Sequence, residues 1–121
     1  MLLFMNPFGP VCRKMDKTKL LALLGLAQKA GKIVSGEFAV EQAVRNKKAC
    51  LVLVAEDASE NSKKSYRDLT GYYGIPCYEV VSKEEIGESI GKAHRAALAV
   101  TDQGFSLALA KLLGLGVLAK E

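Results

Sequence analysis

The residues best suited to chemistry begin with a glycine and a short amphipathic segment. Gly36 opens the segment Glu37 to Asn46, and a basic cluster of Arg45, Lys47 and Lys48 follows. A helix that starts at a glycine has free backbone N–H groups at the positive end of its dipole. Such groups suit an anion or an electron-rich base edge. We therefore expect an anion-binding feature at the start of this helix.

A second polar group is the segment Gly91 to Arg95, which is predicted to be a loop. It contains Lys92, Arg95 and His94, the one histidine of the chain. A lone loop histidine is usually a surface residue or a nucleic-acid contact, and only occasionally a general base. The loop therefore favours contact with a polyanion over catalysis.

Other candidates for catalysis or metal binding are few. The sequence has no GxSxG, HExxH or paired-carboxylate motif, and its best acidic pair, Glu56 and Asp57, is typical of cap and turn residues after a strand. The cysteines, Cys12, Cys50 and Cys77, are odd in number and form no CxxC pair, which fits a reducing cytosol and no zinc site. We predict no catalytic residue, metal, cofactor or small-molecule substrate.

Charge and length limit the class of protein further. The chain has 121 residues, enough for one domain with a buried core, and a formal net charge of +4 from 17 basic and 13 acidic residues. Residues 1–15 hold two of the bases and no acid, so the remainder has 15 bases against 13 acids. Any RNA or DNA surface must therefore be a local patch. No apolar run approaches the ~20 residues of a membrane span, so we expect a cytoplasmic protein without a membrane partner.

Helical and strand patterns alternate along the chain and must position these groups. They are predicted at residues 17–29, 33–34, 37–46, 49–55, 60–73, 77–81, 82–89, 96–101 and 103–113, beginning and ending with a helix. Strict alternation with apolar strands predicts an α/β fold, a three-layer α/β/α sandwich with a roughly four-stranded mixed sheet. We assign residues 16–114 to this domain, 1–15 to a disordered or artefactual N-terminal tail, and 115–121 to a C-terminal tail.

Two helix starts carry side chains typical of caps. Asp57 with Glu60 three residues later fits a capping box, and Ser59 is the alternative cap for the same helix. Ser82 with Glu85 fits a second capping box. Sites in such sheets gather at one edge, where loops and helix ends converge. The turns around residues 36 and 57–59, Lys83 and the loop are all expected to meet there.

Taken together, several segments resemble a known family. They are Gly36 at a helix start and the segments Lys48 to Ser59 (KACLVLVAEDAS), Tyr72 to Gly87 (YYGIPCYEVVSKEEIG) and Ile90 to Phe105 (IGKAHRAALAVTDQGF). This pattern resembles the kink-turn RNA-binding ribosomal proteins of the L-seven-Ae and thirty-e type, especially their small bacterial branch. The resemblance covers nearly the whole domain. It implies an α/β/α sandwich that binds kinked RNA stems in ribosomal, guide or regulatory RNAs.

The resemblance also implies where RNA would bind. In the family a glycine and a small residue precede an Asn-Glu pair that reads guanine edges, a lysine follows one helical turn later, and a second lysine and a loop complete the surface. Here Gly36, Lys83 and the loop Gly91 to Arg95 match. The implied RNA-binding residues are Ser35, Gly36, Glu37, Phe38, Gln42, Arg45, Lys83, Lys92, Ala93, His94 and Arg95.

Three positions depart from the family signature. Phe38 and Ala39 occupy the Asn-Glu positions, and Gln42 occupies that of the first lysine. In protein–DNA complexes, a direct side-chain contact to a base contributes about 1–3 kcal/mol to discrimination against other bases. Loss of two such contacts, at Phe38 and Ala39, is therefore enough to remove specificity for kink-turn RNA. Phe38 has two interpretations: an exposed aromatic on which an unpaired base stacks, or an inward core residue, which the following apolar residues favour.

Two functions follow from these observations. The first is a small RNA-binding protein, ribosome-associated, that docks a kink-turn-like structured RNA, ribosomal or regulatory, with ribosomal proteins as further partners. The alternative is a protein-interaction module on the same fold that has lost kink-turn binding, because an altered, less polar face resembles an interface core.

Overall fold

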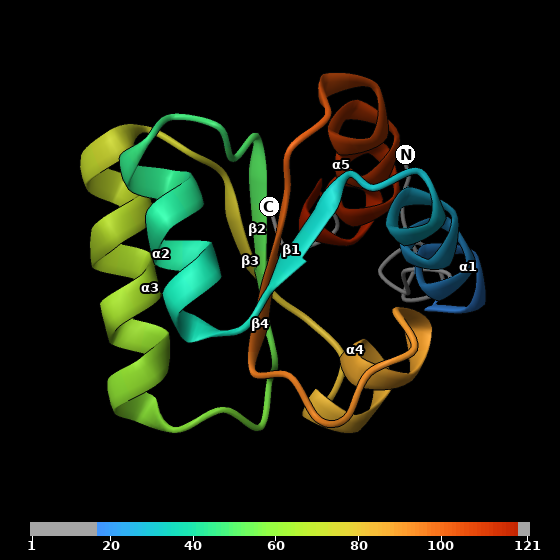
Figure 1. Cartoon of the computed structure of the whole chain (residues 1–121), viewed down its shortest axis with the longest axis horizontal. Helices are drawn as coiled ribbons and strands as arrows, with labels where there is room; N and C mark the ends of the chain where they lie inside the picture. The colour runs from blue at the N-terminus through green and yellow to red at the C-terminus, as the bar shows by residue number, and fades with distance from the viewer. Residues whose placement is uncertain (1–16, 119–121) are drawn as a thin grey trace, which may run out of the picture.

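The computed structural model describes residues 17–118, with side chains as far as Leu113. The elements are α1 (Lys17–Lys29), β1 (Ile33–Ser35), α2 (Glu37–Arg45), β2 (Leu51–Val54), α3 (Glu60–Tyr73), β3 (Cys77–Glu79), α4 (Lys83–Ser89), β4 (Ala97–Val100) and α5 (Gln103–Leu118). Helices α2 and α3 cover one face of the sheet, and α1, α4 and α5 cover the other (Figure 1). The predicted three-layer sandwich is confirmed. The predicted tail at residues 1–15 lies outside the described residues.

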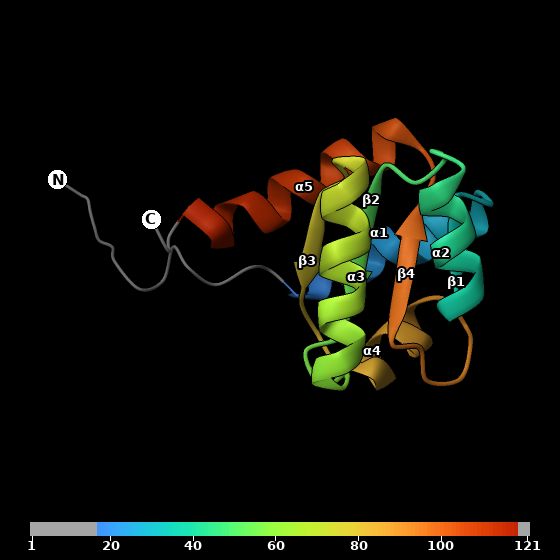
Figure 2. The same ribbon diagram turned by 90° about the vertical axis from the view of Figure 1, so that its left-hand side faces the viewer.

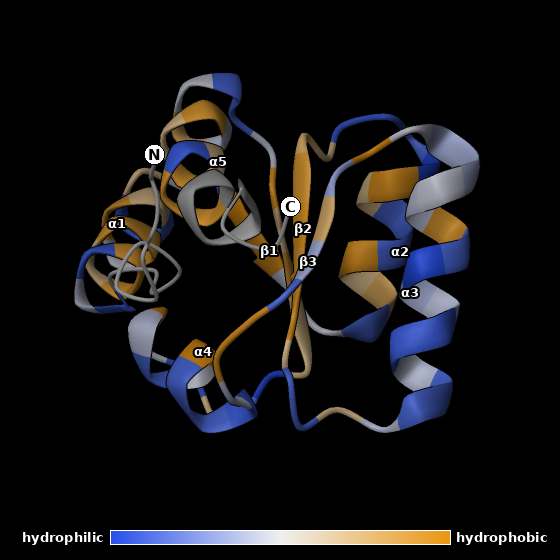
Figure 3. Cartoon of the chain, turned by 180° about the vertical axis from the view of Figure 1, so that it is seen from behind, coloured by the Kyte–Doolittle hydropathy of each residue, from blue (hydrophilic) through white to orange (hydrophobic). Residues whose placement is uncertain are grey.

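The four strands form one mixed sheet in the order β1-β4-β2-β3. Strand β4 is antiparallel to both β1 and β2, and β3 is parallel to β2. The last strand in sequence is therefore inserted between the first two. All residues of β2 and β4 are buried, as expected for strands covered on both faces. Figure 3 shows the apolar part of α2 on the side of the helix that lies toward this sheet.

Strand lengths differ from those predicted. The predicted strands at 49–55 and 96–101 shorten to β2 and β4, and the predicted strand at 33–34 gains Ser35. The predicted strand at 77–81 ends at Glu79, because Val81 takes a positive φ of 54° and leaves the extended conformation. The N–H of Val80 still donates to the Val54 carbonyl at 3.0 Å. Strand β3 is therefore a short edge strand, which leaves little free backbone for pairing with other chains.

Helix ends show one large and one small correction. Helix α2 ends at Arg45, one residue before the predicted end. Helix α5 continues to Leu118 although its end was predicted at Leu113 (Figure 2). Glycine lowers helix propensity by about 1 kcal/mol, which made residues 114–118 a poor helix prediction, but the sequence there has no proline to stop it. None of the helices within residues 17–118 is long and apolar enough to cross a membrane.

The capping box predicted at Asp57 is wrong, and the one at Ser82 is confirmed. Helix α3 begins after Ser59, whose side chain accepts from the Ser62 N–H at 3.1 Å. Asp57 lies too far before the first helical residue to cap it. At α4 the Ser82 hydroxyl accepts from the Glu85 N–H at 3.1 Å, and the Glu85 carboxylate accepts from the Ser82 N–H at 2.9 Å.

Candidate nucleic-acid interface

The start of α2 lies at the end of strand β1 and is left open. Gly36 is its N-cap, with φ 95° and ψ 151°, and no side chain caps the helix. This conformation is essentially restricted to glycine. The Gly36 N–H donates to the Ala97 carbonyl at 3.4 Å, which attaches the turn to β4. The next N–H groups thus remain available to an external acceptor.

Phe38 points outward beside this open end. Phe38 is 75 % exposed, so the interpretation of this residue as a core residue is wrong. Residues of an α-helix are 100° apart, and the buried side of α2 consists of Val40, Ala43 and Val44. Phe38 falls on the opposite side, together with Gln42 one turn later. Exposure of a large aromatic here leaves its face free for stacking.

Hydrogen bonds join the four segments that were expected to meet at this edge. The Asp57 carboxylate accepts from the backbone N–H of Lys83 at 2.9 Å. The Arg95 N–H donates to the Lys83 carbonyl at 3.2 Å, and the Arg95 guanidinium donates to the Ser35 hydroxyl at 3.3 Å. Asp57 therefore positions the start of α4, and Arg95 ties the loop to both α4 and β1.

The loop before β4 presents four exposed residues, Gly91, Lys92, Ala93 and His94. Its position depends on Gly87 in α4, whose carbonyl accepts from the Lys92 N–H at 2.8 Å. A Cβ atom at Gly87 would lie 2.2 Å from the Ala93 carbonyl oxygen. Gly87 was not predicted as a functional residue from the sequence. A glycine inside a short helix weakens that helix, so its presence there could have indicated a position where packing leaves no room for a side chain.

Backbone strain also marks this edge. Val81 is buried and has a φ of 54°, and its carbonyl accepts from the Glu56 N–H at 2.8 Å. A β-branched residue rarely adopts a positive φ, and such a conformation costs about 1–3 kcal/mol. It persists because packing and the hydrogen bond hold it. The turn directs the chain into Ser82 and Lys83.

The side chains of two predicted RNA-binding residues lie in a cavity between α2 and α3 instead of in this group. Glu37 and Arg45 line this cavity, and Arg45 donates to Glu41 at 2.9 Å. This hydrogen bond raises the pKa of Arg45, which stays charged. Arg45 is about 13 Å along the helix axis from Gly36 at the usual rise per residue. The structure thus brings together Ser35, Gly36, Phe38, Lys83 and the loop, and places Arg45 elsewhere.

A metal site or a reactive thiol would be a further route to chemistry in the described part of the chain. No group of three or more His, Cys, Asp or Glu side chains there could hold a metal ion. The Cys77 thiol has a raised pKa because it is desolvated by burial, which makes it a weak nucleophile.

The sequence is similar to a known protein family and to two of its bacterial members. Residues 18–110 match the profile of the Ribosomal protein L7Ae/L30e/S12e/Gadd45 family. The chain is 50% identical over 91 residues to the RNA-binding protein YlxQ of Bacillus subtilis (strain 168), covering 75% of this chain and 91% of that protein. It is 44% identical over 91 residues to the protein of that name from Enterococcus faecium, covering 75% of this chain and 87% of the relative.

Solved structures agree with this relationship. A protein with unknown function from Bacillus halodurans has a TM-score of 0.77 and 41% identity, covering 79% of this chain and 97% of that one. The Giardia lamblia 15.5kD RNA binding protein has a TM-score of 0.69 at 18% identity, covering 89% and 90%, which establishes a shared fold. With the profile match over most of its length, this chain belongs to the Ribosomal protein L7Ae/L30e/S12e/Gadd45 family.

Proposed function

We propose that this chain is a small RNA-binding protein that docks a structured, kink-turn-like RNA at the edge formed by α2, α4 and the loop before β4. The observation that carries the proposal is the exposed Phe38 beside the uncapped start of α2, next to Lys83 and the exposed loop. The names of the two YlxQ relatives support RNA as the ligand. We place this activity in the cytoplasm, in association with ribosomal or regulatory RNA and ribosomal proteins.

Each part of the edge has a distinct role in the proposed complex. The open N–H groups after Gly36, together with Lys83 and Lys92, contact phosphates, which supplies affinity without sequence information. Phe38 stacks on an unpaired base, an interaction worth about 1–3 kcal/mol per base. The Gln42 amide, on the same side of α2, donates to and accepts from a base edge. Arg95 holds the loop in place and does not itself contact RNA, because its guanidinium already donates hydrogen bonds to the Ser35 hydroxyl and to the His94 carbonyl.

This set of contacts predicts reduced selectivity for the kink-turn geometry. Neither Phe38 nor Ala39 can form hydrogen bonds with guanine edges through its side chain, and Gln42 carries no charge. Affinity then depends mainly on phosphates and stacking, and it falls steeply with salt.

A titration at matched salt tests the proposal. A standard kink-turn RNA and an unkinked hairpin of the same length and composition are compared by calorimetry or gel shift. We expect binding to both at low salt and a modest preference for the kinked RNA. Equal affinities would reject kink-turn selectivity, and no binding to either RNA at low salt would reject RNA as the ligand.

The role of Phe38 is tested separately with a matched aromatic control. Phe38→Ala should weaken RNA binding about tenfold, the loss of one stacking contact. Tyr72 is also highly exposed, at 84 %, but it lies near the C-terminal end of α3. Tyr72→Ala should leave RNA affinity unchanged. The triple reversion Phe38→Asn, Ala39→Glu, Gln42→Lys should raise kink-turn affinity and selectivity; no gain would mean that the loop or sheet edge has diverged too.

A protein-interaction module on the same fold is the second candidate. The specific observation in its favour is again Phe38, since exposed aromatics are enriched at protein interfaces. If Phe38→Ala leaves RNA affinity unchanged but abolishes co-purification of a defined ribosomal protein, this second function replaces the first.

A further inference from the structure

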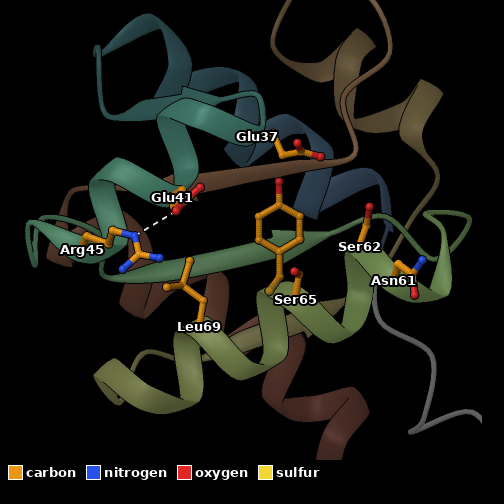
Figure 4. Close-up of a pocket in the computed structure, with 8 residues that line it drawn as sticks. Glu37, Glu41, Arg45, Asn61, Ser62, Ser65 and Leu69 are labelled. Carbon is orange, nitrogen blue, oxygen red and sulfur yellow. Dashed lines mark hydrogen bonds and ion pairs between the residues drawn. The ribbon is translucent and has the colours of Figure 1, made fainter.

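A polar cleft between α2 and α3 lies beside the proposed RNA edge and has no role in it. Its volume is about 300 Å³, and its lining includes Glu37, Glu41 and Arg45 from α2 and Tyr66 and Leu69 from α3. Figure 4 shows the two glutamates on one wall and the serine side chains of α3 on the other. We call this the α2–α3 cleft.

The buried hydroxyl of Tyr66 is the unusual feature of the α2–α3 cleft. Tyr66 is only 4 % exposed, and its hydroxyl has no hydrogen-bond partner among the described residues. Burial, followed by the charges of Glu37 and Glu41, raises its pKa to about 12. The hydroxyl therefore stays protonated and feels both carboxylates. Buried polar groups are nearly always paired, so one without a protein partner calls for an explanation.

The charge of the cleft is uneven. Glu41 is neutralised by Arg45 at 2.9 Å. Glu37 has no ion pair or hydrogen bond within the described part of the chain, although it acts electrostatically on Tyr66. One exposed, uncompensated carboxylate and one buried, unpartnered hydroxyl thus belong to the lining of the same cleft. This pairing excludes an anion and favours a cation that carries N–H donors.

We infer that the α2–α3 cleft binds a primary alkylammonium group. An ammonium has three N–H donors, which can be shared between the Glu37 carboxylate, the Tyr66 hydroxyl oxygen and a serine hydroxyl of α3. The methylene stem then lies along Leu69 and the tyrosine ring, as lysine stems do on apolar surfaces. A free polyamine and a lysine side chain of a protein present the same chemistry.

The experiment follows backbone amide shifts of the full chain by NMR during titration with n-butylammonium. Saturable shifts are expected at Ser62, Ser65 and Tyr66, and tetramethylammonium, which has the same charge but no N–H donor, should bind at least fivefold more weakly. Equal binding of the two cations, or shifts spread over the surface, would overturn the inference. Spermidine and Nα-acetyl-lysine methylamide are titrated in parallel, and the tighter of the two identifies the source of the amine.

Variants separate this site from the RNA edge. Tyr66→Phe removes only the hydroxyl, and Glu37→Gln removes only the charge; each should weaken n-butylammonium binding at least fivefold. Tyr72→Phe is the matched control and should bind as the wild type does. Thermal unfolding of Tyr66→Phe should occur at or above the wild-type temperature, because an unpartnered buried hydroxyl is lost. Unchanged amine affinity in Tyr66→Phe would reject the site. RNA affinity of Tyr66→Phe should equal that of the wild type, so failure of one proposal does not imply failure of the other.

Discussion

Helices α2 and α4 both start at the proposed RNA edge, yet their first turns are built in opposite ways. Helix α4 begins with a reciprocal capping box between Ser82 and Glu85, and the N–H of Lys83 is taken by Asp57. Helix α2 begins at Gly36 without a side-chain cap. One start is closed by the chain itself, and the other is left open to an external acceptor.

This difference indicates that the start of α4 stabilises the fold, whereas the start of α2 is available to bind RNA. A capped start contributes about 1 kcal/mol to stability and needs no ligand. An uncapped start gives up that contribution and keeps its N–H groups directed at the space where RNA is proposed to bind. We therefore expect changes at the cap and the glycine of α4 to act on fold stability and loop position, whereas changes at the start of α2 and at the Lys83 side chain act on affinity. The four predictions below test this division.

The largest effect is expected at Gly87, which supports the loop from within α4. In Gly87→Ala the new Cβ would lie 2.2 Å from the Ala93 carbonyl oxygen, so the loop must move. Overpacking of this kind costs about 3 kcal/mol. Urea denaturation should show this loss, and RNA affinity should fall with it. Gly71→Ala in α3 is the control, since nothing lies within 4 Å of its Cβ; it should gain about 0.5–1 kcal/mol.

Gly36→Ala tests the open start itself. A φ of 95° with ψ of 151° is a conformation that alanine avoids, so we expect a loss of about 2 kcal/mol in urea denaturation. Nothing lies within 4 Å of a Cβ at this position, so the cost comes from the backbone alone. RNA affinity should also decrease, because the turn must shift. A variant as stable as the wild type that also binds RNA equally would break the comparison.

Ser82→Ala tests the closed start. It removes the hydroxyl that accepts from the Glu85 N–H and should cost about 1 kcal/mol. Ser82→Asp, which restores an acceptor, should recover most of this loss. If Ser82→Ala instead weakened RNA binding at unchanged stability, the cap of α4 would take part in recognition and the division would fail.

The smallest effect concerns pH. The hydrogen bond from the Ser82 N–H, with Lys17 at 3.3 Å, holds the pKa of Glu85 below its ordinary value. A depressed carboxylate pKa stabilises the fold above the unfolded value of about 4.3 and loses that contribution as pH falls through the folded pKa. The stability advantage of the wild type over Glu85→Gln should therefore shrink in acid.

Most of the fold could be predicted because its signals are local. The apolar runs that became β2 and β4, and the helical spacing of α1, depend on residues close together in sequence. The insertion of β4 between β1 and β2 was not predicted, because strand order depends on long-range pairing. The extension of α5 was missed because its glycines lower intrinsic propensity.

The site was predicted less completely, for a related reason. Gly36, Lys83 and the loop were expected at one edge, and hydrogen bonds join their segments there. The favoured inward orientation of Phe38 was wrong because its apolar neighbours do not share its side of the helix. Asp57 was assigned to the helix that follows it, whereas its acceptor serves a backbone N–H 26 residues later. Such contacts have no local sequence signal.

The place of β4 in the sheet has a consequence for how the protein is made. Strand β4 pairs with both β1 and β2, yet it is the last strand to leave the ribosome. Until residues 97–100 emerge, β1 has no neighbour in the sheet, and only the parallel pair β2–β3 can form. Non-local pairing of this kind is slow compared with local contacts. The loop that precedes β4 is thus positioned at the end of synthesis, and the nascent chain acquires its proposed RNA edge only when the domain is complete.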